Sequence, residues 1–198
     1  MSQADKQRWV LAALDEYEIR LLRYALRLVG DPDLARDAVQ HAFVKLCDQT
    51  PESVGERPAA WLFRVCRNRA LDHIRHRCRQ QSFDGGSAAA GDRLAAVDSL
   101  RAAEPDPATV AQSQELVLHL RKLLTGLPAL QCEAIDLWCE GFVYRQIAEI
   151  MERQEGYVRV LVHRGLTQLR EHPRVQAWLS EETTGQRVRP ARQPAANS

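Results

Sequence analysis

Apolar side chains recur at helical spacing along the first part of the chain, and no stretch alternates as a half-buried strand would. One face of a first predicted helix carries Leu11, Leu14, Leu22, Leu26 and Val29. The sequence GDPD predicts where this helix ends and the next begins, with Gly30 as the stop, Asp31 as N-cap and Pro32 at the first helical position. The pattern therefore predicts two consecutive helices joined by a short turn.

Two helical segments complete the predicted N-terminal part. The segment that starts at Pro32 has an inward side formed by Leu34, Ala38, Ala42, Phe43 and Leu46. After the polar loop DQTPESVGER, Pro58 opens a third helix, whose apolar side holds Trp61, Leu62, Val65 and Ile74. Together with the first helix, these segments predict a small three-helix core.

The second half of the chain predicts another helical group, which starts near Glu115 with Leu116, Leu120, Leu123 and Leu124. Pro128 stands early in the next predicted helix, and Gly141 lies past its end. A short helix follows, with Ile147, Ala148 and Met151 on its apolar side. After a tight turn comes a longer helix with Val158, Leu161, Val162, Leu166 and Leu169. Two helices joined by such a turn, the second ending in basic residues, predict a helix-turn-helix.

The predicted fold is all-α, with two small helical domains joined by a flexible linker. We expect a first domain over residues 1–81, a linker over 82–112, a helix-turn-helix domain over 113–172 and a mostly disordered tail over 173–198. The linker is rich in Gly, Ala, Ser and Pro, which is typical of flexible connections. The tail loses its apolar periodicity past Leu179.

The formal net charge of +1 conceals a strong segregation of charge. Residues 57–81 hold seven arginines and one acid, Asp72, a local balance of +6. Residues 82–112 hold five acids and two arginines, a balance of −3. So basic a helix is either a solvated face or a surface that lies against something negative.

Composition excludes several classes of chemistry. The five cysteines form an odd set without a C-x-x-C pair, and the six histidines form no metal-binding spacing. Neither a phosphate-binding G-x-x-x-x-G-K loop nor a G-x-S-x-G elbow is present. We therefore expect no enzyme, no cofactor and no metal site. No apolar run approaches the roughly 20 residues that span a bilayer, so we expect no membrane insertion and a cytoplasmic protein.

Three blocks in a fixed order resemble the extracytoplasmic-function group of bacterial RNA polymerase sigma factors. They are YALRLVGDPDLARDAVQHAFVKLC, PAAWLFRVCRNRALDHIRHRCR and LPALQCEAIDLWCEGFVYRQIAEIM. The second block matches the family's W-L-x-x-x-x-x-N-x-x-x-D-x-x-R spacing at Trp61, Leu62, Asn68, Asp72 and Arg75. The resemblance covers residues 10–81 and 115–171.

The resemblance implies a transcription initiation factor that binds core RNA polymerase and promoter DNA. It implies that the helix from Pro32 to Cys47 docks on the polymerase, with outward candidates Asp37, Gln40, His41 and Lys45. It also implies that the basic helix meets the minus-ten element, with candidates Trp61, Arg67, Asn68, Arg75, Arg77 and Arg79. Arginines spaced along a rigid helix suit a row of phosphates.

Some roles on the basic helix stay open at this stage. Trp61 is either a core aromatic or a ring on which unstacked bases pack. Asn68 either bonds locally or contacts a base. Helical spacing gives Asp72 three possible basic partners, which are Arg69, Arg75 and His76.

The second domain departs from the family pattern. Val143 stands where a capping serine is usual, and Glu152 and Gln154 occupy the turn that normally carries glycine and then serine. The expected minus-35 contacts are Arg153, Tyr157, Arg159, His163 and Arg164. Because VRVLV replaces usual phosphate contacts with apolar side chains, a protein-contact role for this domain remains an alternative.

A stand-alone helix-turn-helix regulator is the alternative function, and the additional basic and docking helices argue against it. The sequence leaves open whether an inhibitory anti-sigma partner masks either domain.

Overall fold

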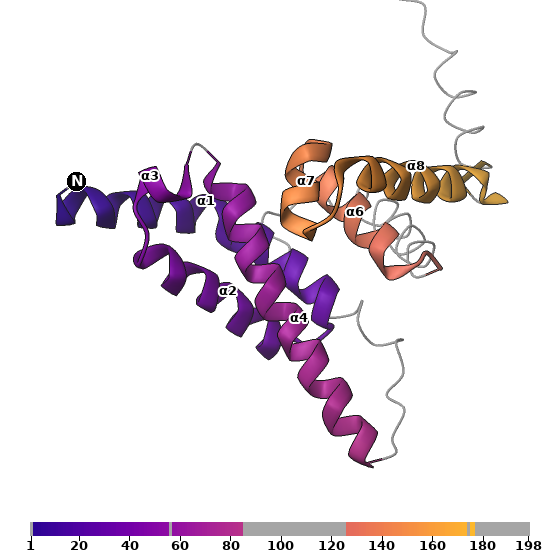
Figure 1. Cartoon of the computed structure of the whole chain (residues 1–198), viewed down its shortest axis with the longest axis horizontal. Coiled ribbons are helices and arrows are strands. Elements are labelled where there is room, and N and C mark those ends of the chain that lie inside the picture. Colours follow the sequence, from indigo (N-terminus) through magenta and orange to yellow (C-terminus); the bar gives the residue numbers. More distant parts are fainter. Residues whose placement is uncertain (1, 56, 85–125, 174, 177–198) are drawn as a thin grey trace, which may run out of the picture.

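The structure is a computed structural model that describes residues 2–55, 57–84, 126–173 and 175–176. All regular elements within these ranges are helices. Residues 2–84 form a first unit and residues 126–176 form a second unit (Figure 1). The all-α prediction is confirmed. The predicted linker from residue 85 onward, the leucines from Leu116 to Leu124 and the tail beyond residue 176 lie outside the described residues.

The first unit contains α1 (Gln3–Val29), α2 (Pro32–Cys47), the short α3 (Pro51–Val54) and α4 (Pro58–Asp84). Helices α1, α2 and α4 pack against one another around one apolar core (Figure 1). Helix α4 starts at Pro58 as predicted and runs three residues beyond the expected end of the first domain at Gln81.

The predicted turn between α1 and α2 is confirmed residue by residue. Gly30 adopts φ 70° in the left-handed region and donates its backbone N–H to Leu26 at 2.9 Å. The Asp31 side chain accepts from the backbone N–H groups of Asp33 and Leu34, with Pro32 at the first helical position. These caps fix where α1 stops, so α2 can fold back against it.

The expected inward faces are mostly correct, with one error in α1. Leu26, Val29, Ala38, Ala42, Phe43, Leu46 and Leu62 are buried. Leu11 is 59% exposed, so its expected place on the inner face is wrong. The buried stripe of α1 instead runs through Ala13, Leu21, Tyr24 and Ala25. Leu11 lines an open hollow beside Cys47 at the end of α2.

The second unit contains α6 (Ala129–Cys139), α7 (Tyr144–Met151) and α8 (Glu155–Glu171). Ile147, Met151, Val158 and Val162 are buried as predicted. A Cβ on Gly165 would lie 2.5 Å from Cδ1 of Ile135, so glycine lets α8 cross α6 closely. Past α8, Val175 and Gln176 donate to the His172 carbonyl in a further helical turn.

The two units lie against each other through α1, α4, α6 and α7. The aromatic ring of Phe63 on α4 contacts Tyr24 on α1 and Phe142, which precedes α7, with ring centroids 5.2 and 4.9 Å apart. Phe63 and Tyr24 are fully buried. The contact between the units therefore has an apolar centre as well as the charged groups described below.

Candidate nucleic-acid interface

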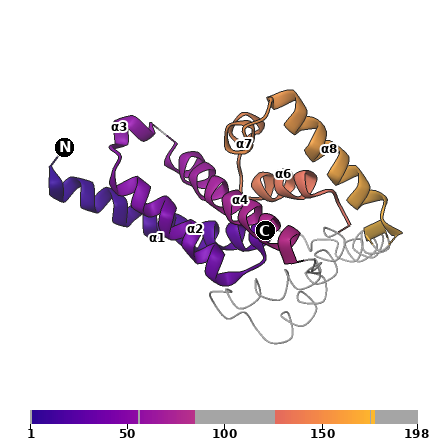
Figure 2. The ribbon, with the colours of Figure 1, turned by 60° about the horizontal axis from the view of Figure 1, so that its bottom comes forward.

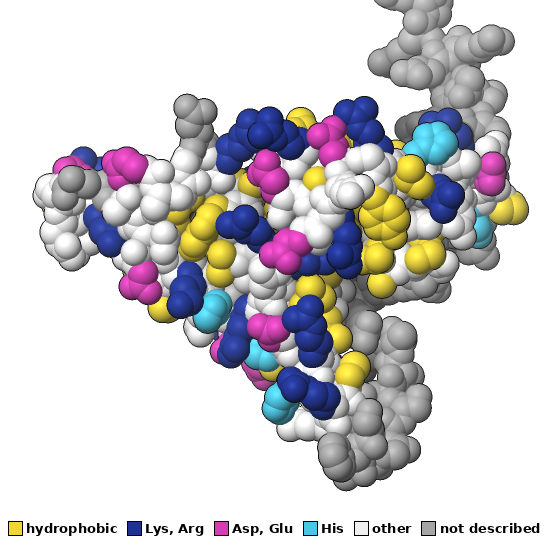
Figure 3. Space-filling model, in the orientation of Figure 1, with side chains coloured by type: hydrophobic (Ala, Val, Ile, Leu, Met, Phe, Trp, Pro, Cys, Tyr) yellow, Lys and Arg dark blue, Asp and Glu magenta, His cyan; other side chains and the backbone are white. Residues whose placement is uncertain are grey.

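Helix α4 divides its arginines between two environments. Arg75 and Arg79 are exposed toward the C-terminal end of the helix. Arg77 is half-buried and lies 3.5 Å from both the Val29 carbonyl and the Asp31 carboxylate. Figure 3 shows Lys and Arg side chains gathered along this part of the surface. The exposed end of α4 thus presents positive charge along a rigid rod, as phosphate binding requires.

Arg67 has a different environment, because it is buried between the two units. Its side chain is 6% exposed and that of Glu133 on α6 is 5% exposed. Arg67 donates from Nε to Oε1 of Glu133 and from Nη2 to Oε2 at 3.2 Å. In this arrangement the guanidinium binds a carboxylate of the second unit and presents no surface to a phosphate.

Tyr24 completes this buried cluster. Its hydroxyl donates to Oε1 of Glu133 at 2.9 Å. Burial, followed by the charge of Glu133, raises the pKa of Tyr24 well above its usual value. Burial alone would lower the pKa of Arg67, but its hydrogen bond to Glu133 and the Glu133 charge raise it overall. Arg67 therefore stays charged, and the phenol of Tyr24 stays neutral.

Asn68 lies beside Arg67 and also contacts the second unit. Its Nδ2 donates to Oε1 of Glu152 at 3.1 Å. Glu152 is the turn residue between α7 and α8 and, among the described residues, the one non-glycine residue with positive φ, at 54°. The glutamate that replaces the usual turn glycine thus adopts the left-handed conformation that favours glycine.

The partner of Asp72, which helical spacing left open, is Arg75, whose Nη1 donates to Oδ1 at 2.9 Å. Arg69 and His73 instead hold Asp37 on α2, each at 2.8 Å from Oδ2. The hydrogen bond from Arg69 lowers the pKa of Asp37. Of the outward candidates on α2, Gln40 and Lys45 are exposed, whereas Asp37 and His41 are half-buried. Asp37 therefore links α2 to α4 through these two contacts, while 46% of its side chain stays exposed.

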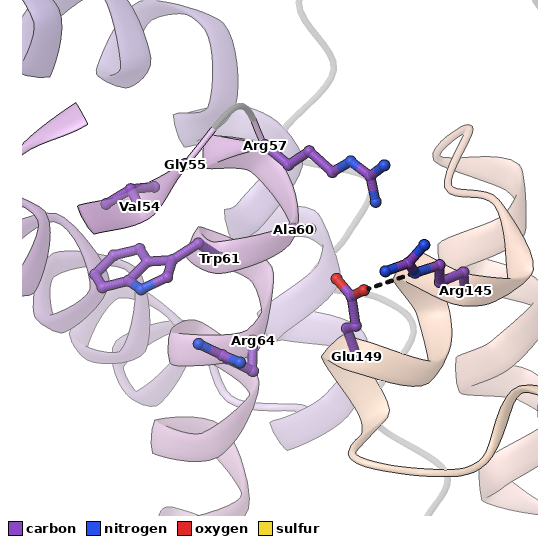
Figure 4. Close-up of a pocket in the computed structure, with 8 residues that line it drawn as sticks. All are labelled: Val54, Gly55, Arg57, Ala60, Trp61, Arg64, Arg145 and Glu149. Carbon is purple, nitrogen blue, oxygen red and sulfur yellow. Dashed lines mark ion pairs between the residues drawn. The ribbon is translucent and has the colours of Figure 1, made fainter. Parts of the chain in front are cut away.

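Trp61 is partly buried, as the first of the two roles considered for it requires, and its contact with bases stays a prediction. It packs against the core and also lines a hollow of about 380 Å³ between the start of α4 and α7. Figure 4 shows Arg57, Arg64 and Arg145 around this hollow, with Glu149 paired to Arg145 at 3.4 Å. The three arginines make the rim basic.

The outer side of α8 carries the other predicted DNA contacts. Tyr157, His163 and Arg164 are exposed, as is Arg153 in the turn. Arg159 is exposed but paired, with Nη2 2.7 Å from Oε1 of Glu155 and the guanidinium 5.3 Å from the Tyr144 ring. Helix α8 lies at the outer edge of the second unit, away from α2 (Figure 2).

The VRVLV segment of α8 is buried on one side only. Val158, Leu161 and Val162 are buried, whereas Val160 is 41% exposed. Val143 caps α7 without a side-chain hydrogen bond, and Gln146 instead accepts from the Val143 backbone N–H at 3.0 Å.

A second charged group joins α6 to α1. Arg27 Nε lies 3.0 Å from Oδ2 of Asp136, and Arg20 Nε donates to Oε2 of Glu140 at 3.0 Å. Arg20 also donates to the Glu140 carbonyl at 2.7 Å. Sequence reasoning missed these residues, as it missed Glu133 and Tyr24. A signal for Arg67 was present, because it stands four residues after Phe63 and three before Ala70, on a stripe of α4 that is buried.

Asp136 predicts a pH dependence of stability. Burial raises its pKa from 3.8 to about 6. The charge of Arg27 opposes this rise, and the charges of Glu140 and Glu133 add to it. Because the folded protein holds this proton more tightly than the unfolded chain, this group's contribution to stability falls as pH rises from 3.8 to about 6. Urea unfolding of the parent across this range should show a fall in the free energy of unfolding on the order of 2 kcal/mol. The variant Asp136→Asn should not show this fall. Asp33→Asn, at an exposed carboxylate, is the control. An unchanged pH profile in Asp136→Asn would contradict the assignment.

No group of three or more histidine, cysteine, aspartate or glutamate side chains within the described ranges is placed to hold a metal ion. Nor is any helix in those ranges long and apolar enough to span a membrane.

A helical unit with a basic helix, followed by a helix-turn-helix unit, defines an all-α protein of the DNA-binding class. Residues 13–80 match the family Sigma-70 region 2. Over 163 residues the chain is 32% identical to the ECF RNA polymerase sigma factor SigL of Mycobacterium tuberculosis. The matched region covers 80% of this chain and 85% of that relative.

Two further comparisons agree. The chain is 29% identical over 159 residues to the ECF RNA polymerase sigma factor SigE of Mycolicibacterium smegmatis, covering 77% of this chain and 57% of that longer relative. A structure of the sigma factor RpoE in complex with the anti-sigma factor NepR from Bartonella quintana has a TM-score of 0.57 at 27% identity, covering 86% of this chain and 96% of that one. The chain belongs to the ECF RNA polymerase sigma factors, a non-enzymatic class, which confirms the family predicted from the sequence.

Proposed function

We propose that this protein directs core RNA polymerase to a subset of promoters and helps to melt them, acting in the cytoplasm. The observation that carries the proposal is the exposed basic end of α4, with Arg75 and Arg79 on one rigid helix of a unit that matches Sigma-70 region 2. In this proposal α4 meets the minus-ten element, α2 docks on the polymerase through Gln40 and Lys45, and α8 reads the minus-35 element.

Transcription in vitro tests this proposal. Core RNA polymerase with the purified protein should transcribe a subset of promoters from a genomic library, and core enzyme alone should not. Footprints of the protein alone on duplex DNA, with no co-elution with core enzyme and no transcripts, would instead favour a stand-alone helix-turn-helix regulator. Upstream protection by the holoenzyme that is lost in Arg164→Ala would support reading by α8. Protection that persists would leave the second unit as a protein-contact module.

Phosphate contacts from α4 predict a specific change in salt dependence. Arg75→Ala and Arg79→Ala should each weaken promoter binding by the holoenzyme and lower the magnitude of the slope of log K against log salt by about one. Arg36→Ala, at an exposed arginine of α2 paired with Asp33, is the matched control and should leave the slope unchanged. Equal slopes in all three variants and the parent would mean that this end of α4 is only solvated.

A further inference from the structure

The outward side of α8 has an apolar centre. The buried residues of this helix are Val158, Leu161, Val162 and Gly165. Val160 stands on the opposite side and is 41% exposed. Tyr157, three residues before it, and Arg164, four residues after it, are exposed as well. Because residues at these spacings share one face of a helix, the three side chains form a continuous surface, which we call the outer strip of α8.

Arg159 does not belong to the outer strip, although it is the residue next to Val160. At 3.6 residues per turn its side chain is turned about 100° away from that of Val160. Its guanidinium lies 2.7 Å from Oε1 of Glu155 and 5.3 Å from the centre of the Tyr144 ring. The guanidinium is thus held to one side, and the centre of the outer strip consists of aliphatic carbon.

Gly156 stands four residues before Val160, on the same face, and the fold does not require a glycine there. Its φ is not positive, and a Cβ at this position would meet no heavy atom within 4 Å among the residues that the structure describes. Glycine weakens a helix relative to alanine. A glycine without a conformational or packing reason inside the protein suits the close approach of something outside it.

The chemistry of the outer strip fits the major groove of duplex DNA. An α-helix enters this groove with its N-terminal residues against the base edges. Of the four bases only thymine displays a methyl group there, and apolar side chains contact it. The exposed cations Arg153, His163 and Arg164 lie around the strip. An apolar centre with basic surroundings matches methyl groups inside a groove whose walls are phosphates.

We propose that Val160 determines base specificity by packing against the C5-methyl group of a thymine in the upstream promoter element. Tyr157 lies beside this contact, and Arg164 reaches the neighbouring phosphate. The proposal rests on the proposed function, because it takes α8 as the part that meets upstream DNA, and it adds which base is recognised and through which atoms. Since a valine side chain neither donates nor accepts a hydrogen bond, the methyl group alone carries the discrimination.

Deoxyuridine provides the test, because it differs from thymidine only in lacking this methyl group. The holoenzyme is bound to a promoter that it transcribes in vitro, and each thymine of the protected upstream element is replaced by deoxyuridine in turn. Binding should weaken about fourfold at the position that faces Val160, as expected for the loss of one buried methyl group, and change little at the others.

Three variants connect this effect to the outer strip. Val160→Ala should bind the unmodified promoter more weakly than the parent, and deoxyuridine should then weaken its binding no further. Val143→Ala shortens another exposed valine of the same unit, outside α8, and should keep the full effect of deoxyuridine. Gly156→Ala should be at least as stable as the parent in urea and yet bind the promoter more weakly, because its methyl group takes up space that the DNA needs.

Each contrary result overturns a stated part of the proposal. A protected element without thymine, or one in which no deoxyuridine weakens binding, shows that α8 recognises no methyl group. An equal deoxyuridine effect in Val160→Ala and the parent assigns the contact to another residue. Unweakened binding by Gly156→Ala overturns the close approach. An unprotected upstream region leaves the outer strip as a protein-contact surface. These results count against this proposal alone as long as the holoenzyme makes transcripts, whereas their absence removes the proposed function itself.

Discussion

Glu133→Ala is expected to cost about 3–5 kcal/mol of folding free energy, because it leaves the buried Arg67 charge without its counter-ion. It also removes the acceptor of the Tyr24 hydroxyl. Urea unfolding at pH 7 measures the loss. The distance between fluorophores at Cys47 on α2 and at Gln168→Cys on α8, with the two other exposed cysteines replaced by serine, reports whether the units separate before the first unit unfolds.

Two controls separate the charge effect from the loss of side-chain volume. In the double variant Arg67→Met with Glu133→Leu no charge is buried, so most of the lost stability should return. Glu149→Ala breaks an exposed pair with Arg145 and should cost less than about 1 kcal/mol. A Glu133→Ala variant as stable as Glu149→Ala would show that the buried pair contributes nothing.

Phe63→Ala is expected to cost about 3–5 kcal/mol, since it empties the centre of the aromatic cluster. Phe63 is fully buried and contacts rings from both units, Tyr24 and Phe142. The loss should therefore appear both in the unfolding free energy and in the contact between the units. Guanidinium unfolding gives the first, and the fluorophore distance gives the second.

Phe63→Leu keeps most of the volume and should cost about 1–1.5 kcal/mol, which makes it readable if the alanine variant fails to fold. Val44→Ala truncates a side chain that is 62% exposed and should change stability by less than about 0.5 kcal/mol. If the unfolding free energy of Phe63→Ala lies within about 1 kcal/mol of that of the parent, the cluster relaxes and does not hold the units together.

Local signals predicted the helices well. The stop at Gly30, the cap at Asp31 and the start of α4 at Pro58 each depend on residues within one turn of the position they define. The inward faces of α2 and α8 followed from apolar spacing for the same reason. Leu11 failed because periodicity gives the direction of a side chain and not whether another helix reaches it.

The candidate site was harder to predict, because its arrangement depends on contacts between distant parts of the chain. Arg67 and Glu133 are 66 residues apart, and nothing in the sequence of either helix identifies the other as its partner. Only the placement of the second unit against α4 shows that they neutralise each other. Asp72 was easier, since all its possible partners stood within one turn, and the structure selected Arg75. The roles of Arg75, Arg77 and Arg79 toward DNA remain predictions.

The left-handed backbone at Glu152 separates the stability of the fold from the strength of the contact between the two units. A non-glycine residue in this conformation costs about 1–2 kcal/mol, which a glycine would recover. The same side chain, however, supplies the oxygen that Asn68 binds. A glycine at this position would relieve the backbone strain of the turn and would also remove a hydrogen bond between the two units. Heat resistance is therefore a poor guide to the contact between the units in this protein.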